Sequence, residues 1–323
     1  MSSFKKSQYQ RQEQLINDSE IFENDPGSGF FKGRYRPFVL KDGLKNLYAL
    51  IRTDVLKYFA DNDISWWGGN RPSGHTLSSQ IACLNHLFAI RKDRDAVLSL
   101  LNGVRNEFKD VLPVKCDKES AFIGFEVVSK DDHLNEKTCT RGSNCTSVDA
   151  FILARHREND SVWLIPIEWK YTESYENQDK SNEDRDNEPK GSNGKGMERL
   201  RRYSCLIDAS AQLRSLESYA GSVYYQEPFY QLMRQTLWAE NIVKHKDTEV
   251  LEADDYLHIH VIPEDNRDLL DKRYKVSGKG MEETWREMLV DQSKYVIISP
   301  KALMAPVAPK YPDLTDYLAE RYW

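Results

Sequence analysis

The 323-residue sequence has no hydrophobic run of the roughly 20 residues that a bilayer span needs, and its N-terminus lacks an apolar segment of signal-peptide length. Cysteine is also scarce. The five cysteines are an odd number at irregular spacing and include no CxxC pair, which argues against a disulfide framework and suits a reducing compartment. We therefore expect a cytoplasmic protein that does not interact with a membrane.

Three of the cysteines flank a histidine, in the order Cys116, His133, Cys139 and Cys145. Thiolates and imidazoles hold zinc in structural sites, but these spacings match no common structural zinc motif. Reduced thiols in a loop are therefore the simpler interpretation of this segment.

The sequence also lacks the basic excess of an obvious nucleic-acid-binding protein, since its formal net charge is −6. The charges are unevenly distributed, however. Residues 173–189 are strongly acidic, whereas basic residues gather in 31–38 and 194–203. Each basic cluster is compatible with a phosphate-binding surface or with an ordinary solvated face. Composition alone leaves nucleic acid open as a partner.

Hydrophobic residues make up 40% of the chain and aromatic residues 11%, which predicts a folded protein of one large or two moderate domains. Helices are expected at 44–62, 75–92, 93–108, 197–218, 227–245 and 281–291, and strands at 121–128, 147–155, 162–170, 255–263 and 294–300. The first three strands predict an antiparallel meander. The later strands follow helical segments, so the pattern predicts an α/β fold with a mixed sheet covered by helices.

Two of the expected strands carry charged residues where a core would be apolar. Asp149 stands inside TSVDAFIL, and a carboxylate there is destabilising unless it is paired or bound to a cation. In the stretch SVWLIPIEWKYTES, Glu168 and Lys170 stand where the apolar run ends. They share one face because side chains alternate along a strand. Eighteen residues separate Asp149 from Glu168, so neighbouring strands can bring the two acids together. A solvated strand end with a weak ion pair is the competing interpretation of Glu168 and Lys170.

The pattern D-x18-E-x-K, together with SSQIACLNHLF, FEVVS, SVDAFIL and PIEWKYTES, resembles the PD-(D/E)xK superfamily of restriction-endonuclease-like nucleases. More closely, it is similar to a bacterial branch of predicted restriction-endonuclease-like proteins. The resemblance covers about residues 74–263, and one departure is Val148, which stands where the name of the superfamily has proline. The resemblance implies a restriction-endonuclease-like core, in which a central mixed β-sheet is flanked by helices.

The resemblance also suggests how the chain is divided. We expect an N-terminal helical extension at 1–73 and a nuclease-like core at 74–263. The polar stretch 173–196 has almost no large apolar residues and is expected to be a mobile insert in this core. A C-terminal helix-strand-helix extension at 264–323 would pack on the core.

What the resemblance implies chemically is Mg²⁺-dependent hydrolysis of a phosphodiester in DNA, for defence or DNA processing, with Mn²⁺ able to substitute. Asp149 and Glu168 would hold the metal together with the backbone carbonyl of Trp169, because Mg²⁺ prefers oxygen ligands. Lys170 would position the attacking water or stabilise charge in the transition state. Glu126, in the strand of FEVVS, is a candidate for a supporting ligand, and a structural role fits it equally well.

Many relatives carry an acid on the first core helix, where this sequence has Gln80. A neutral amide recruits a second cation less strongly than a carboxylate, so the number of metals stays open. Gln80 and the nearby Asn85 are candidate supporting residues, and both amides can instead bridge buried backbone groups.

Positive and amide side chains follow the three strands and are candidates for contact with phosphates. These candidates are Arg202, Tyr203, Gln231, Arg234 and Gln235. Such contacts would fix a nucleic acid without reading its sequence, and an ordinary polar helix face is their alternative role. His258 and His260 share one strand face, where packing is a simpler role than metal binding.

The sequence therefore predicts a metal-dependent nuclease that acts on nucleic acid, in the first place DNA. Two other classes stay open, namely a catalytically inactive nucleic-acid-binding module of the same fold and a protein-interaction protein. The retained Asp149, Glu168 and Lys170 favour the enzyme, because a module without catalysis has no need for a destabilising charge cluster. Sequence specificity and endonuclease or exonuclease action stay open. The oligomeric state is open too, and a homodimer is compatible with the sequence.

Overall fold

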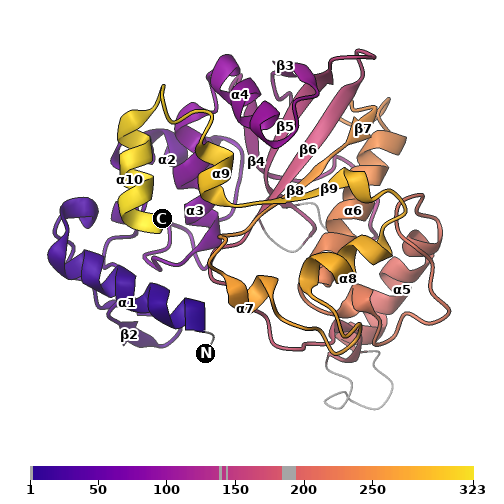
Figure 1. Cartoon of the computed structure of the whole chain (residues 1–323), viewed down its shortest axis with the longest axis horizontal. Helices are drawn as coiled ribbons and strands as arrows, with labels where there is room; N and C mark the ends of the chain where they lie inside the picture. The colour runs from indigo at the N-terminus through magenta and orange to yellow at the C-terminus, as the bar shows by residue number, and fades with distance from the viewer. Residues whose placement is uncertain (1–2, 138–139, 143–144, 184–193) are drawn as a thin grey trace.

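The structure is a computed structural model that describes residues 3–137, 140–142, 145–183 and 194–323. Its centre is a seven-stranded sheet with helices on both faces (Figure 1). The strands are β3 (Phe108–Leu112), β4 (Ile123–Val127), β5 (Val148–His156), β6 (Val162–Trp169), β7 (Asp255–Tyr256), β8 (His258–Val261) and β9 (Tyr295–Ile298). The predicted fold class, a mixed sheet flanked by helices, is confirmed.

The α-helices are α1 (Ser3–Asp18), α2 (Arg52–Asp61), α3 (Ser79–Leu87), α4 (Arg94–Val104), α5 (Lys195–Asp208), α6 (Phe229–Lys244), α7 (Arg267–Leu270), α8 (Met281–Met288), α9 (Pro300–Met304) and α10 (Pro312–Tyr322). Short 3-10 turns are η1 (Glu20–Phe22), η2 (Gly43–Asn46), η3 (Ala49–Ile51), η4 (Phe88–Ile90), η5 (Lys180–Asn182), η6 (Val223–Tyr225) and η7 (Gln292–Lys294). In the described residues, no helix combines the length and the hydropathy that crossing a bilayer requires.

The direction of the strands changes across the sheet. β5 pairs antiparallel with β4, β3 and β6, which confirms the expected meander. β8 pairs parallel with β6 after a crossover that contains α5 and α6, and β9 pairs parallel with β8 after a crossover that contains α7 and α8. The carboxyl ends of β6, β8 and β9 therefore lie at the same end of the sheet.

Each face of the sheet packs on its own hydrophobic core. Helices α2, α3, α4, α9 and α10 cover one face, and α5, α6 and α8 cover the other. Ile165, Ile167 and Trp169 belong to the first core. Because side chains alternate along β6, Glu168 and Lys170 lie on the second face, beneath α6.

The two segments expected to be extensions, 1–73 and 264–323, contain strands as well as helices. The N-terminal segment contains a hairpin of β1 (Gly29–Phe31) and β2 (Arg34–Arg36), separate from the central sheet. The C-terminal segment supplies β9, an integral strand of the central sheet. Its helix α10 contains Arg321, which is buried and donates a hydrogen bond to the carbonyl of Asn46 at 2.5 Å.

Some of the expected elements have different bounds. The helix expected at 93–108 ends at Val104, because Arg105 takes an extended conformation, and Phe108 then begins β3, a strand that was not expected. The strand expected at 255–263 is split into β7 and β8. Of the expected mobile insert, residues 184–193 lie outside the described residues.

Candidate active site

Three carboxylates form a row across the sheet. Ala150 pairs with Ile167, so the antiparallel register places Asp149 directly opposite Glu168 on the adjacent strand. On the other edge of β5, the register likewise places Glu126 opposite Asp149. The expected adjacency of the three strands is therefore present, and Asp149 and Glu168 line the same cavity of about 250 Å³.

Asp149 has one hydrogen-bond donor in this row, the backbone N–H of Trp169, at 2.7 Å from Oδ2. Burial raises the pKa of the Asp149 carboxyl well above its usual range, and the negative charges of Glu168 and Glu126 raise it further. Without a cation, Asp149 therefore tends to keep its proton. A positive ion in the cavity would favour the carboxylate form.

Glu168 and Lys170 are buried and held by amides of α6. The Lys170 ammonium donates to Glu168 Oε1 and to Gln231 Oε1, while Gln235 Nε2 donates to Glu168 Oε2. Burial alone would lower the pKa of Lys170, but nearby negative charge, that of Glu168 first, outweighs it and raises this pKa well above its usual range. Lys170 therefore stays cationic and has no lone pair with which to bind a metal.

Glu126 takes an unusual backbone conformation for a strand residue, with φ at 51°. Residues in this left-handed region are uncommon outside glycine and often mark functional sites. Gln80 Nε2 donates to Glu126 Oε1 at 2.6 Å, and Ser147 Oγ donates to Oε2 at 3.3 Å. Burial, opposed by these two hydrogen bonds and reinforced by the charge of Glu168, raises the pKa of Glu126 to about 7.

The segment after β6 adds two residues to the cavity that were not singled out in the sequence. Glu173 accepts a hydrogen bond from the N–H of Tyr171 at 2.7 Å, and the Tyr175 ring lies 5.7 Å from the Lys170 ammonium. The signal that could have identified them is their position within five residues of Lys170. That segment had been interpreted only as the start of a polar insert.

Three of the candidate phosphate contacts, Gln231, Arg234 and Gln235, lie on α6 and line the cavity. Arg234 is anchored by Glu136, with Nη2 at 2.9 Å from Oε1. The two remaining candidates do not line the cavity. They are Tyr203, whose hydroxyl donates to Glu136 at 2.6 Å, and Arg202, which pairs with Glu198 at 3.4 Å.

Two other candidates lie on strand β6 and helix α3. The residue Trp169 lines the cavity, and its indole packs in the core on the opposite face of the sheet. Asn85 lies away from the cavity, where it accepts from the N–H of Tyr48 at 2.8 Å and donates to the carbonyl of Asn46 at 3.0 Å. Asn85 thus bridges buried backbone groups.

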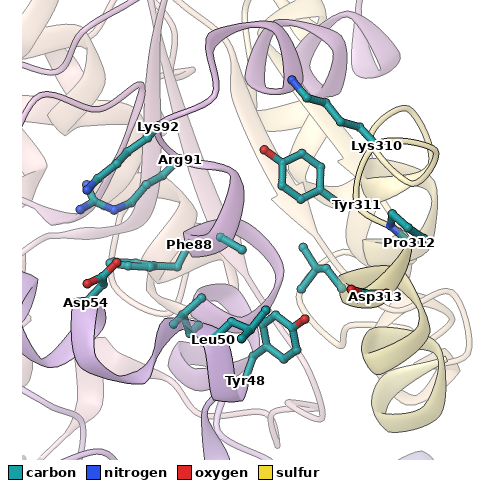
Figure 2. Close-up of a pocket in the computed structure, with 13 residues that line it drawn as sticks. Tyr48, Leu50, Asp54, Phe88, Arg91, Lys92, Lys310, Tyr311, Pro312 and Asp313 are labelled. Atoms are coloured by element: carbon teal, nitrogen blue, oxygen red, sulfur yellow. The ribbon is translucent and has the colours of Figure 1, made fainter.

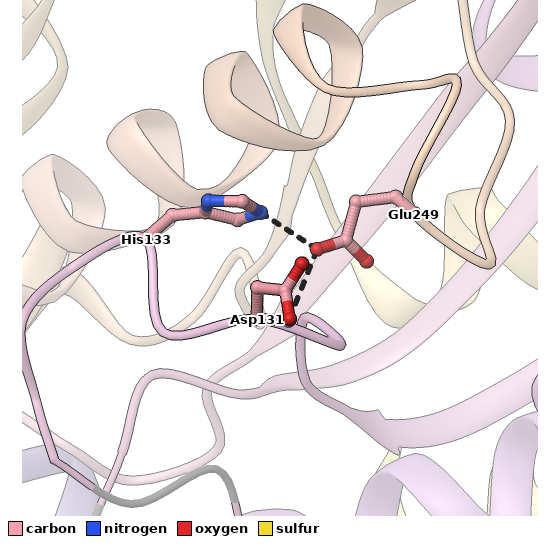
Figure 3. A group of neighbouring side chains, drawn as sticks. All are labelled: Asp131, His133 and Glu249. Atoms are coloured by element: carbon pink, nitrogen blue, oxygen red, sulfur yellow. Dashed lines mark hydrogen bonds and ion pairs between the residues drawn. The ribbon is translucent and has the colours of Figure 1, made fainter.

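A second group of possible metal ligands lies in loops after β4 and α6. The ligand atoms of Asp131, His133 and Glu249 are within 4.8 Å of one another (Figure 3). Glu249 is already hydrogen-bonded at both oxygens. Its donors are His133 Nε2 at 2.7 Å, the N–H of Lys130 at 2.9 Å and the N–H of Asp131 at 3.3 Å.

Of the four zinc candidates in the sequence, His133 belongs to this group, whereas Cys116 and Cys145 do not. His133 bonds to Glu249, Cys116 contacts Asp117 at 3.6 Å, and Cys139 lies outside the described residues. The two β8 histidines are fully buried, and burial lowers the pKa of His258 to about 4. His258 and His260 are therefore packed as neutral rings.

A further cavity, of about 330 Å³, lies between α10 and the turns around η3 and η4 (Figure 2). Its two lysines are paired with acids, since Lys310 contacts Asp93 and Lys92 contacts Glu119. It lacks the facing strand carboxylates, Asp149 and Glu168, that line the other cavity.

Comparison with known proteins identifies the family of this chain. Residues 5–323 match the family described as "Restriction Endonuclease associating with ARP". No curated protein and no solved structure matches the chain significantly.

Proposed function

Because the chain belongs to this restriction-endonuclease family, we propose that it is a metal-dependent nuclease that hydrolyses phosphodiester bonds in DNA. The observation that carries the proposal is the placement of Asp149 opposite Glu168, with Lys170 on the same face of the same cavity. Two acids that can hold a cation and a lysine that can stabilise negative charge, all on one cavity wall, suit cation-assisted phosphodiester cleavage.

The residues of the cavity suit a small divalent cation such as Mg²⁺, or Mn²⁺ in its place. Their donor set consists of carboxylate oxygens, which such cations prefer, with the Trp169 carbonyl as a further oxygen ligand. Among the described residues, Asp149 has a single hydrogen-bond donor, and its pKa is raised, so its carboxylate form is under-stabilised in the metal-free protein. A divalent ion bound there would polarise the phosphate and lower the pKa of the attacking water.

The side chains around the two acids have separate roles in this proposal. Lys170 keeps its proton and is fixed by Glu168 and Gln231, so its ammonium can stabilise charge on a phosphate oxygen in the transition state. Gln235 holds Glu168 in place. Arg234, anchored by Glu136, is positioned to meet a neighbouring phosphate of the strand.

The position of Gln80 favours one cation over two. Gln80 stands where many members of the superfamily carry an additional acid. Its amide instead donates a hydrogen bond to Glu126 and so orients that carboxylate. Glu126 then supports the site by holding a water or by sharing the charge of the bound cation. Its pKa of about 7 allows it to do either near neutral pH.

The test is cleavage of linear, circular and single-stranded DNA and of RNA by the purified chain with Mg²⁺, Mn²⁺ or Ca²⁺. We expect DNA cleavage with Mg²⁺ and Mn²⁺, and little turnover with Ca²⁺. Absence of cleavage of all four substrates, with Mn²⁺ binding unchanged in Asp149→Ala, would contradict the proposal. It would favour the catalytically inactive nucleic-acid-binding module instead.

A further inference from the structure

The hairpin of β1 and β2 and the loop before α3 carry exposed aromatic rings. Among the large apolar side chains that are exposed in the described residues, the aromatic ones are Phe30 at 63%, Tyr35 at 73% and Trp67 at 44%. Phe30 pairs with Tyr35 across the hairpin, and their ring centroids lie 5.3 Å apart. The hairpin lies at the periphery, below α1 and apart from the central sheet (Figure 1). Apolar side chains that gather on a surface mark binding sites.

The other face of the hairpin fixes it to the molecule. The Phe31 ring packs against Trp67, with centroids 5.4 Å apart, and against His75, with centroids 4.6 Å apart. Because side chains alternate along a strand, this packing directs Phe30 and Tyr35 to the opposite face. The two most exposed rings therefore stand on a fixed support and face solvent.

The hairpin is also positively charged. Residues 26–41 include four basic side chains and no acid. The four are Lys32, Arg34, Arg36 and Lys41. The Lys32 ammonium lies 5.8 Å from the centroid of the Trp67 ring. Burial lowers the pKa of His75 to about 4, and the positive charges of Lys5 and Lys32 lower it further. Rings and cations are thus interleaved, as in proteins that bind single-stranded nucleic acid.

Two hydrogen bonds connect this region to the row of acids. The N–H of Trp67 donates to Gln80 Oε1 at 3.0 Å, and Gln80 Nε2 donates to Glu126 Oε1 at 2.6 Å. The base of the hairpin pairs with residues 74–76. Three residues later Ser79 begins α3 and lines the cavity of about 250 Å³. The aromatic region is therefore a neighbour of the proposed cleavage site.

A strand with unpaired bases fits these side chains better than a duplex does. Side chains that read the major groove of a duplex are mostly polar and meet base edges, whereas the rings of Phe30 and Tyr35 suit the faces of bases. Those faces are accessible where bases are unpaired. Lys32 and Arg34 are exposed beside the rings and can meet the phosphates between stacked bases. The connection to the row of acids favours a nucleic-acid strand over a membrane surface, which attracts similar side chains.

We propose that a hairpin surface, formed by Phe30, Tyr35, Trp67, Lys32 and Arg34, binds unpaired bases of the DNA strand that enters the carboxylate cavity. The rings stack on the bases, and the two cations contact phosphates. The inference rests on the proposed nuclease function, because it assigns to that nuclease a substrate with a single-stranded segment. Strand binding itself needs neither metal nor cleavage, so it can be measured separately.

The test is binding of fluorescent oligonucleotides to the full-length Asp149→Asn protein in EDTA, measured by anisotropy. The probes are a single-stranded oligothymidylate, an abasic strand of the same length and a fully paired duplex. We expect the oligothymidylate to bind about 10-fold more tightly than the abasic strand, because the abasic strand keeps the phosphates and lacks the stacking bases. It should also bind more tightly than the duplex.

The rings are tested by truncation. Phe30→Ala and Tyr35→Ala should each weaken binding of oligothymidylate by about 10-fold, since each removes one stacking ring. Both positions are exposed, so the circular dichroism spectrum should stay that of the parent protein. Val290→Ala is the matched control, because Val290 is 55% exposed and follows α8, on another part of the surface. It should leave binding unchanged.

The cations are tested by the dependence of binding on salt. Arg34→Gln should reduce the slope of log K against log salt by about 0.7, the value for one phosphate contact of a single strand. Lys109→Gln is the matched control, because Lys109 is an exposed cation on β3, which pairs with the half of β5 that lies away from Asp149. It should leave the slope unchanged.

The inference is overturned if Phe30→Ala and Tyr35→Ala bind oligothymidylate as tightly as Val290→Ala does, or if the abasic strand or the duplex binds as tightly as oligothymidylate. Binding to vesicles of phosphatidylglycerol that is lost in Tyr35→Ala, without binding to oligonucleotide, would overturn it in favour of a membrane surface. Cleavage by the wild type with Mg²⁺ is assayed separately. Cleavage without hairpin-dependent binding overturns this inference alone, whereas hairpin-dependent binding without cleavage overturns the nuclease function and leaves a strand-binding surface.

Discussion

The molecule holds two groups of acids that look alike by composition and differ in how their charges are satisfied. In the row of Glu126, Asp149 and Glu168, Asp149 lines a cavity and receives a single backbone N–H from the part of the chain that the structure describes. In the loop group, Glu249 receives two backbone N–H groups and the ring of His133. Asp149 in the first group would be stabilised by a proton or by the proposed cation, whereas Glu249 in the second group already has the donors that a buried carboxylate needs.

The comparison teaches that closeness of ligand atoms is a weak criterion for a metal site. Asp131, His133 and Glu249 meet the distance criterion, with all ligand atoms within 4.8 Å. Their hydrogen bonds nevertheless tie two loops together and give both carboxylate oxygens of Glu249 a donor. In the row across the sheet, mutual repulsion and burial instead raise the pKa values of Glu126 and Asp149.

The largest effect that would separate the two groups is loss of catalysis. Asp149→Asn should reduce Mg²⁺-dependent cleavage by about 10³-fold or more and should weaken Mn²⁺ binding, because a proposed metal ligand is removed. Glu249→Gln is the matched change in the loop group and should alter the cleavage rate by no more than about twofold. Single-turnover cleavage and Mn²⁺ titration measure both quantities. Equal losses of cleavage and of Mn²⁺ binding in the two variants would show that the two groups of acids do not differ in this way.

A smaller effect is expected for the lysine, which separates metal binding from catalysis within the row. Lys170→Met should depress cleavage by about 10²-fold while Mn²⁺ binding stays close to that of the wild type, since the ammonium stabilises transition-state charge and is not a ligand. Measuring kcat and the Mn²⁺ dissociation constant on the same preparation checks this. Loss of Mn²⁺ binding in Lys170→Met would show that the lysine organises the ligands as well.

The pH dependence of stability should report on the row of acids across the sheet. The folded-state pKa of Glu126 is raised to about 7, above that of an unfolded glutamate, so the folded protein binds more protons between these two values. The metal-free protein should therefore lose stability as pH rises from about 4.5 to about 7. Urea unfolding in EDTA at several pH values measures this loss. Glu126→Gln should reduce this pH dependence, and the raised pKa of Asp149 should maintain the rest of it.

The smallest effects are expected in the loop group. Glu249→Gln should lower the free energy of unfolding by about 1–3 kcal/mol, because the amide cannot accept all the hydrogen bonds that the carboxylate accepts. Asp131→Asn, at an exposed position, should change it by less than about 0.5 kcal/mol. Urea unfolding at pH 7 compares the two. A large loss of stability on adding EDTA, present in wild type and absent in Asp131→Asn, would instead identify a bound metal in the loops.

The sequence was sufficient to predict the pairing of Asp149 with Glu168, for a physical reason. Alternation fixes the face of each strand residue, and 18 intervening residues leave room for one tight antiparallel return. The mixed sheet followed from the same strands and from the helical segments between them. These are local patterns, which can be recognised in the sequence without knowledge of contacts between distant segments.

The elements that were not predicted depend on contacts between distant segments. The short run of β3 becomes a strand because the edge of β5 is available for pairing. The bond between Gln80 and Glu126 requires α3 to dock beside β4, and Glu249 reaches the loop at Lys130 across 119 residues. Partners of this kind leave no periodic signal in the sequence.

The bond between Arg321 and Asn46 has a consequence for the order of events during synthesis. These residues are 275 positions apart, and β9 completes the sheet from the same late segment. Closing such distant contacts is entropically slow, and neither hydrophobic core is fully covered until residues 295–322 have emerged from the ribosome. An incomplete chain would expose the edge of β8 and the apolar face of α3. We therefore expect nascent chains that stop before β9 to depend on chaperones and to be cleared by proteases.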